Sequence, residues 1–235
     1  MIEKLKGAKK KDIHQSILRK TLRLFAEPLS LALSKTPVTP NQVSFVYLIF
    51  SVLVSYLYSK GQYGSNITGG ILLFFLLILD KVDGSLSRIK GTDSDYGFWL
   101  DRTFNDFSRI ILFFGLAIGL YRQTQNVIYI FITFFLMSTY LLVGITHEVF
   151  RLIMPDSNKI LGSIKSHYHF LINFVYGEPL VPFIIFVFSF TPLLHIGVIL
   201  LSLYGVLFLI AQYCVMTLKV KKQLSHVSRM DSKIK

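Results

Sequence analysis

Residues 80–88 read DKVDGSLSR, and residues 97–105 read GFWLDRTFN. The first stretch ends one long apolar run and the second begins the next, so carboxylates lie where a membrane helix normally avoids charge. A charged side chain in the middle of a bilayer costs roughly 3 kcal/mol or more, so it usually faces a cavity and has a function. These two stretches therefore decide both the fold and the candidate site.

The composition is that of a membrane protein. The chain has 235 residues, of which 52% are hydrophobic and 16% charged, and its mean hydropathy is +0.55. A soluble domain has about 25% charged residues. Apolar runs of roughly 20 residues can cross a bilayer, and several fill residues 43–218. The single cysteine provides no disulfide framework. We therefore expect one polytopic membrane domain.

The expected fold class is all-α integral membrane, with six transmembrane helices preceded by an N-terminal interfacial amphipathic helix. Residues 12–34 carry apolar side chains at helical spacing with basic residues elsewhere, which predicts the interfacial helix. Prolines end it, and Asn41 is expected to cap the next helix. The second span is expected to continue as a helix past Asp83. The predicted spans are 43–58, 67–79, 97–121, 127–147, 180–190 and 194–218.

These patterns divide the chain into three parts. Residues 1–40 form a basic tail and the juxtamembrane helix, residues 41–218 form the six-helix membrane domain, and residues 219–235 form a basic cytoplasmic tail.

The net charge of +12 is unevenly distributed. The loops after the first, third and fifth predicted spans contain only Lys60 and Arg122 as positive residues. The positive-inside rule therefore places both termini and the acidic stretch on the cytoplasmic side. The basic flanks also suit anionic membrane lipids. Since no nucleic-acid-binding signature accompanies the charge, we do not expect nucleic acid as a partner.

The spacing of the acidic residues predicts one site on two helices. Asp80 and Asp83 are three residues apart and share a helix face, as do Asp101 and Asn105, four apart. Because the connecting loop is short, the two helices are expected to be antiparallel neighbours. Their oxygen-bearing side chains can then converge on a hard cation such as Mg²⁺, which leaves positions open for phosphate. Arg88, one turn beyond, can pair with a phosphate through its fork of donors.

The full pattern resembles a family signature. Asp-x2-Asp-Gly-x2-Ala-Arg-x8-Gly-x3-Asp-x3-Asp is the signature of the CDP-alcohol phosphotransferases (the CDP-alcohol phosphatidyltransferase family). Ser87 replaces the usual alanine, and Asn105 replaces the final aspartate. Residues 39–44, TPNQVS, also resemble the entry to the family's first helix, so the resemblance covers nearly the whole chain. The residues that match in identity and spacing are Asp80, Asp83, Gly84, Arg88, Gly97 and Asp101.

The resemblance implies a membrane phosphotransferase that moves a phospho-alcohol group from a CDP-alcohol to an acceptor hydroxyl and releases CMP. Such a reaction belongs to phospholipid or polyol-phosphate biosynthesis. The implied donor is CDP-diacylglycerol, an archaeal equivalent or another CDP-alcohol, and the implied acceptor is an alcohol or a polyol phosphate. The resemblance also implies a two-metal site with Mg²⁺ or Mn²⁺ and a homodimer.

The resemblance also assigns roles to residues. Asp101 and Asn105 take catalytic positions, and Asn105 stands where the family has a metal ligand that is also its expected base. The implied metal ligands are Asp80, Asp83, Asp101 and Asn105. The implied contacts with the CDP moiety are Gly84, Ser87, Arg88, Gly97 and Asp80.

Asn105 leaves three interpretations open. An amide oxygen can ligate a metal but cannot take a proton in the useful range, and a positioned base contributes about 10²–10⁴-fold. The enzyme uses another base, or needs none because its acceptor is already an anion. Alternatively, the chain is a silent nucleotide- or lipid-binding protein, or the asparagine is an introduced inactivating change. An ion-coupled transporter is the competing class.

Other polar residues are weaker candidates, each of which also has an ordinary structural interpretation. Asp106 follows Asn105 but is turned about 100° around the helix, so it would need a local π-bulge to replace a base. His147 and Glu148 are candidates for a substitute base or an acceptor contact. The remaining candidates are Arg151, Lys159 and Lys165 for a phosphorylated acceptor, His167 and His169 for a metal pair, and Glu178 for a substrate hydroxyl.

Overall fold

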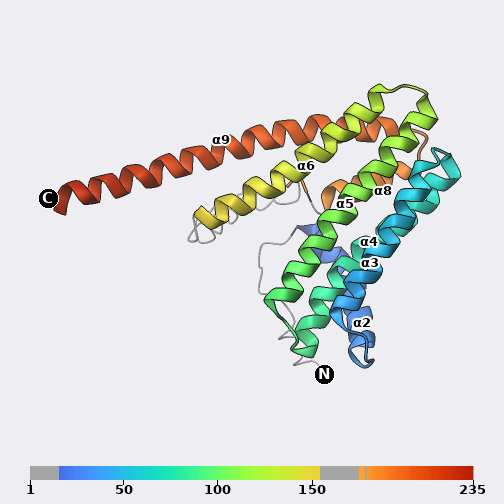
Figure 1. The fold of residues 1–235 in the computed structure, drawn as a ribbon, viewed down its shortest axis with the longest axis horizontal. Coiled ribbons are helices and arrows are strands. Elements are labelled where there is room, and N and C mark those ends of the chain that lie inside the picture. Colours follow the sequence, from blue (N-terminus) through green and yellow to red (C-terminus); the bar gives the residue numbers. More distant parts are fainter. Residues whose placement is uncertain (1–15, 154–174, 178, 235) are drawn as a thin grey trace.

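The computed structural model describes residues 16–153, 175–177 and 179–234, and this part of the chain is helical without strands (Figure 1). The all-α expectation is therefore confirmed for these residues. Their helices are α2 (Ile17–Ser34), α3 (Pro40–Ser59), α4 (Tyr63–Lys90), α5 (Asp95–Thr124), α6 (Ile128–Ile153), α8 (Leu180–Ser189) and α9 (Leu194–Ile234).

Four of the described helices have the length and apolar composition needed to cross a membrane. They are α3, α5, residues Ile128–Phe150 of α6 and residues Leu194–Leu218 of α9. The second predicted span lies on α4, and the fifth lies on α8, an apolar helix of only 10 residues. Four candidate spans are thus found, and six spans stay a prediction. The chain is an integral membrane protein.

Two helices extend further than their apolar runs. α4 is unbroken through Asp83 to Lys90, which confirms the expected continuation of the second predicted span. α9 has 41 residues and continues far beyond the apolar run that ends at Leu218. In Figure 1 its C-terminal half projects beyond the other helices. The acidic stretch of α4 consequently lies on a rigid helix rather than in a loop.

The first described helix packs one side against α4. Ser16 caps α2 by accepting a hydrogen bond from the Arg19 N–H. The buried positions Leu22, Ala26 and Ser30 lie on one face, and the Ser30 hydroxyl is 3.3 Å from the carbonyl oxygen of Val82. Residues 12–15 of the predicted interfacial helix lie outside the described part of the chain. Packing against α4 holds α2 beside the acidic stretch.

The start of α3 differs from the expectation. Thr39, rather than Asn41, is the N-cap: its hydroxyl accepts the Gln42 N–H, and the Gln42 side chain accepts the Thr39 N–H. This reciprocal capping box needs Thr and Gln three residues apart, and Pro40 is well suited to the first helical position. The prediction that Asn41 caps the helix was therefore wrong, and its side chain is available for another contact.

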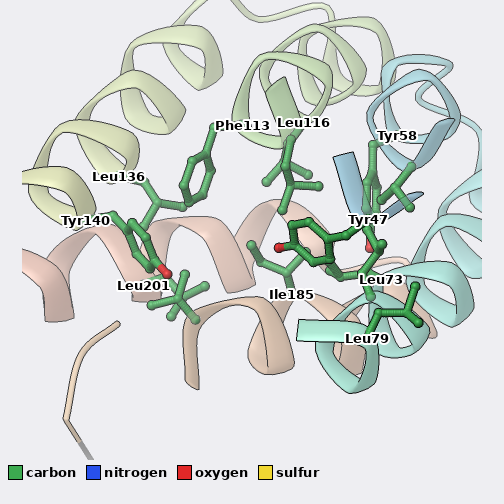
Figure 2. Close-up of a cluster of buried hydrophobic side chains, with 14 of the residues drawn as sticks. Tyr47, Tyr58, Leu73, Leu79, Phe113, Leu116, Leu136, Tyr140, Ile185 and Leu201 are labelled. Atoms are coloured by element: carbon green, nitrogen blue, oxygen red, sulfur yellow. The ribbon is translucent and has the colours of Figure 1, made fainter. Parts of the chain in front are cut away.

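α3 is the central helix around the site. Both α4 and α5 pack along α3, while α6 packs on α5 and α9, and α8 packs on α4 and α9. The sequence predicts that α4 and α5 are direct neighbours. Each of them packs mainly on α3, and they contact each other through side chains such as Asn105 and Asp80. Figure 2 shows the buried cluster between these helices, with Tyr47, Leu116 and Ile185 among its labelled members.

α3 and α5 approach each other at two glycines of α5. A Cβ atom on Gly115 would collide with the carbonyl oxygen of Ser55, and one on Gly119 would collide with that of Tyr58. The Ser55 hydroxyl also donates to the carbonyl oxygen of Ile111 at 2.6 Å. Small residues at such spacing let transmembrane helices pack backbone to backbone. The relative position of α3 and α5 is therefore tightly determined.

We expect Gly119→Leu to destabilise the protein by about 1–3 kcal/mol, the usual cost of overpacking a close contact. The measurement is thermal unfolding of the purified protein in detergent. Gly64→Leu is the matched control, because a Cβ at this helical glycine meets no atom within 4 Å. Equal unfolding temperatures for the two variants would contradict the tight contact.

Candidate active site

Three of the predicted site residues meet between α4 and α5. The side-chain nitrogen of Asn105 donates to Asp80 Oδ1 and to Asp101 Oδ1, at 2.9 Å in each case. Asn105 is only 6% exposed. The other oxygen of Asp80 pairs with the ammonium group of Lys81. Two carboxylates from different helices are thus joined by one amide.

Asp83 lies in the same acidic group, on the side that faces α3. The Ser44 hydroxyl donates to its Oδ2 at 2.8 Å, and the Gly84 N–H donates to its Oδ1 at 2.6 Å. Burial raises the pKa of Asp83 well above its usual value, and the charges of Asp101 and Asp80 raise it further. The two hydrogen bonds oppose this shift. Negative charge is therefore concentrated where α3, α4 and α5 meet.

The expected nucleotide contacts on α4 lie one turn further along the helix. The guanidinium of Arg88 lies 3.5 Å from the point where a Cβ on Gly84 would be, and it donates to the Ser85 hydroxyl at 3.3 Å. Ser87 donates to the carbonyl oxygen of Gly84. Burial lowers the pKa of Arg88, as does the nearby charge of Arg23. A cationic fork of donors thus lies directly beside the backbone of Gly84.

Gly97 lies at the start of α5, beside the first turn of α3. Its N–H donates to the hydroxyl of Ser94, which caps α5. A Cβ on Gly97 would lie 3.6 Å from the side-chain oxygen of Asn41 and 3.2 Å from the Ser94 hydroxyl. A side chain at position 97 would therefore press on Ser94 and touch Asn41, where the start of α5 lies beside α3.

Sequence reasoning missed three residues of this site: Asn41, Ser44 and Lys81. Asn41 and Ser44 belong to the stretch TPNQVS, which by itself indicates only a helix entry. The signal that could have identified them is their place on the first turn of the helix preceding the acidic pair. Lys81 follows Asp80 directly, and this adjacency in the sequence could have indicated an ion pair. Asn41 and Ser44 bring α3 into the site, and Lys81 brings a positively charged ammonium group.

Asp106 does not replace the missing carboxylate. Its Oδ1 accepts a hydrogen bond from Arg109 at 2.6 Å, and its Oδ2 lies 3.6 Å from Arg102 Nε. The guanidinium of Arg109 lies 5.5 Å from the ring centre of Tyr140 on α6. Since α5 is a regular α-helix from Asp95 to Thr124, no π-bulge turns Asp106 toward Asp101.

The remaining candidates lie elsewhere or outside the described residues. His147 and Glu148 lie near the C-terminal end of α6, a helix that packs on α5 and α9. Lys159, Lys165, His167, His169 and Glu178, together with the side chain of Arg151, lie outside the described part of the chain.

The acidic group suits a hard cation by its chemistry. Three carboxylates and an amide are the ligand types that Mg²⁺ and Mn²⁺ prefer, and hydrogen bonds hold Asp80, Asp101 and Asn105 together. Within the described residues, however, no three Asp, Glu, His or Cys side chains are grouped as a ready metal site. Asp80 and Asp101 are instead bonded to protein donors: the Asn105 amide donates to one oxygen of each, and Lys81 pairs with the other oxygen of Asp80.

A family model, CDP-alcohol phosphatidyltransferase, matches residues 37–218, which include all the residues of the acidic group. The chain belongs to this family. The matched region begins just before α3 and ends within α9. The family expected from the signature is thereby confirmed.

Individual relatives agree with this assignment. Archaetidylinositol phosphate synthase of Pyrococcus horikoshii is 32% identical over 105 residues, which are 44% of this chain and 54% of that protein. The match thus spans about half the length of that curated relative.

Two solved structures share the fold. The Mycobacterium tuberculosis phosphatidylinositol phosphate synthase PgsA1 with CDP-DAG bound has a TM-score of 0.65 at 16% identity, over 80% of this chain and 92% of that one. Its apo form has a TM-score of 0.54 at 20% identity, over 78% and 92% of the two chains. At these identities the likeness concerns the fold alone.

Proposed function

We propose that this protein transfers a phospho-alcohol group from a CDP-alcohol to an acceptor hydroxyl and releases CMP. The observation that carries the proposal is the meeting of Asp80, Asp101 and Asn105 between α4 and α5, with Asp83 beside them. A CDP-alcohol is a pyrophosphate, so its recognition needs cations next to a cationic donor. The acidic group and Arg88 meet that need within the stretch that matches the family.

In this proposal Asp80, Asp83 and Asp101 hold Mg²⁺ or Mn²⁺, with the Asn105 oxygen as a further ligand if its amide turns. When bound, the metal neutralises charge on the phosphoryl oxygens and on the departing CMP. Arg88 binds a phosphate oxygen through its donors, and Ser87 lies beside it. Gly84 and Gly97 leave room for the nucleotide to approach the backbone.

Asn105 sets a condition on the acceptor. Its amide takes no proton at neutral pH, so the acceptor hydroxyl must lose its proton to another group or react as an anion. We propose a lipid-linked donor, CDP-diacylglycerol or an archaeal equivalent, and an alcohol or polyol-phosphate acceptor. Two similarities support this choice: the Pyrococcus relative is an archaetidylinositol phosphate synthase, and PgsA1 has CDP-DAG bound.

We also propose the membrane arrangement expected from the sequence. Six spans, with α4 and α8 crossing alongside the four candidate spans, put the acidic group and both termini on the cytoplasmic side. The charge asymmetry of the loops supports this orientation. In it, α2 lies at the interface in contact with membrane lipids, residues 219–235 lie in the cytoplasm, and two chains form a homodimer, as the family resemblance implies.

The direct test is to incubate the purified protein with CDP-alcohols and acceptors plus Mg²⁺ or Mn²⁺ and to measure CMP. We expect CMP release that disappears with EDTA. Protection from heat by CDP or CMP without turnover would favour the silent binding protein. Absence of any nucleotide effect would favour the ion-coupled transporter.

We expect Ser44→Ala to weaken the apparent Mn²⁺ affinity in that assay by about 10–100-fold, as is usual when a residue that orients a metal ligand is lost. The rate at saturating Mn²⁺ should change little, because Ser44 positions Asp83 and does not contact the substrate in this proposal. Ser51→Ala is the matched control, since Ser51 is also buried on α3 but donates to the carbonyl oxygen of Leu48 on its own helix. Unchanged Mn²⁺ dependence in Ser44→Ala would contradict the role of this hydrogen bond.

A further inference from the structure

The amide of Asn105 occupies the point between Asp80 and Asp101 where charge compensation is needed. An ionised carboxylate has no hydrogen to give, so the nitrogen end of the amide must face both oxygens. Both distances are 2.9 Å, and the side chain of Asp80 is only 5% exposed. Two charge-assisted hydrogen bonds thus stabilise these carboxylates without a metal.

A cation held by these two carboxylates would compete with this amide. To admit the ion, Asn105 must give up both hydrogen bonds and turn its oxygen inward. The cation gains a neutral ligand in return, whereas an aspartate at this position would supply a fourth negative charge. The asparagine therefore weakens cation binding in two ways, by occupying the oxygens and by lowering the total charge.

The third carboxylate of the group, Asp83, has donors other than Asn105. Asp83 is bonded to the Ser44 hydroxyl and the Gly84 N–H, both of which use single hydrogen atoms. A carboxylate that accepts one hydrogen bond at each oxygen retains lone pairs for a metal. Asp83 is only 6% exposed and adds a third carboxylate to the group, in which Lys81 pairs with Asp80. One cation is sufficient to compensate this charge.

We propose that the Asn105 amide substitutes for one of the two cations, so that the site of this chain binds a single divalent ion through Asp80, Asp83 and Asp101. This inference rests on the proposed function, because it concerns the same metal site. It predicts that the protein is stable without metal. It also predicts that Asn105→Asp creates affinity for a second ion.

The test counts Mn²⁺ ions per chain by titration of the purified protein, with free Mn²⁺ followed by electron paramagnetic resonance. We expect one ion for the native chain and two for Asn105→Asp. Thermal unfolding adds a second readout: the difference between Mn²⁺ and EDTA should be several degrees larger for Asn105→Asp than for the native chain. Thr103→Asp is the matched control, because it adds the same charge to α5 away from the face of Asn105, and it should behave as the native chain.

Two ions per native chain, or one ion in Asn105→Asp, would overturn the inference. A second ion in Thr103→Asp would overturn it as well, since added charge alone would then explain the count. Measuring CMP release by the native protein distinguishes failure of this inference from failure of the proposed function. If the native protein releases CMP with two ions bound, only the single-ion inference is refuted. If it binds no ion and releases no CMP, both the inference and the proposed function are refuted.

Discussion

Asn105→Asp is expected to raise CMP release from a CDP-alcohol by about 10²–10⁴-fold, the usual contribution of a positioned base. The reason is the location of the side chain between Asp80 and Asp101, beside the expected phosphate position. A carboxylate there can take the proton of the acceptor hydroxyl, which an amide cannot. Folding should be preserved in the presence of Mg²⁺, because aspartate and asparagine have the same shape.

The measurement is the rate of CMP release at saturating CDP-alcohol, acceptor and Mg²⁺. Asp106→Asn is the informative control, because Asp106 is the adjacent carboxylate and is bound by Arg102 and Arg109 instead. Its rate should stay within about threefold of the native value. Equal or lower turnover in Asn105→Asp would refute the role of a missing base and favour an acceptor that is already an anion.

Asp101→Ala is expected to lower CMP release by about 10²–10³-fold, the usual loss when one group that stabilises transition-state charge is removed. Asp101 is the carboxylate that α5 contributes, and it lies close enough to raise the pKa of Asp83. Without it, the metal would be held from α4 alone. Protection of the protein from heat by Mn²⁺ should also be lost.

Asp95→Ala is the matched control for this prediction. Asp95 is an exposed carboxylate in the first turn of α5, six residues before Asp101 on the same helix. Its loss should affect only the helix terminus, by roughly 0.3–1 kcal/mol. Similar turnover in Asp101→Ala and Asp95→Ala would remove Asp101 from the site.

The sequence was sufficient for the all-helical fold of the described residues and for the two faces that meet, while six spans stay a prediction. Apolar runs predicted the elements because a bilayer leaves a chain few alternatives to the helix. The spacing of Asp80 with Asp83, and of Asp101 with Asn105, predicted shared faces because three and four residues complete about one turn. The unbroken helix through Asp83 followed from the same reasoning.

The third helix of the site could not be predicted in this way. Periodicity shows which side chains share a face, but it does not show which other helix that face contacts. The contact of Ser44 with Asp83 spans 39 positions of sequence and depends on how α3 crosses α4. The pairing of Lys81 with Asp80 depends on a rotamer, and the cap at Thr39 on a reciprocal pair of hydrogen bonds that Asn41 does not make.

The backbone contact at Gly115 and Gly119 has a consequence for the evolution and redesign of the enzyme. Ser44 and Asn41 lie on α3, while Gly97, Asp101 and Asn105 lie on α5. A slide of one helix along the other would move these two groups apart, and the contact leaves no room for even one added methyl group. Substitutions that change substrate preference should therefore leave the pairing of α3 with α5 in place.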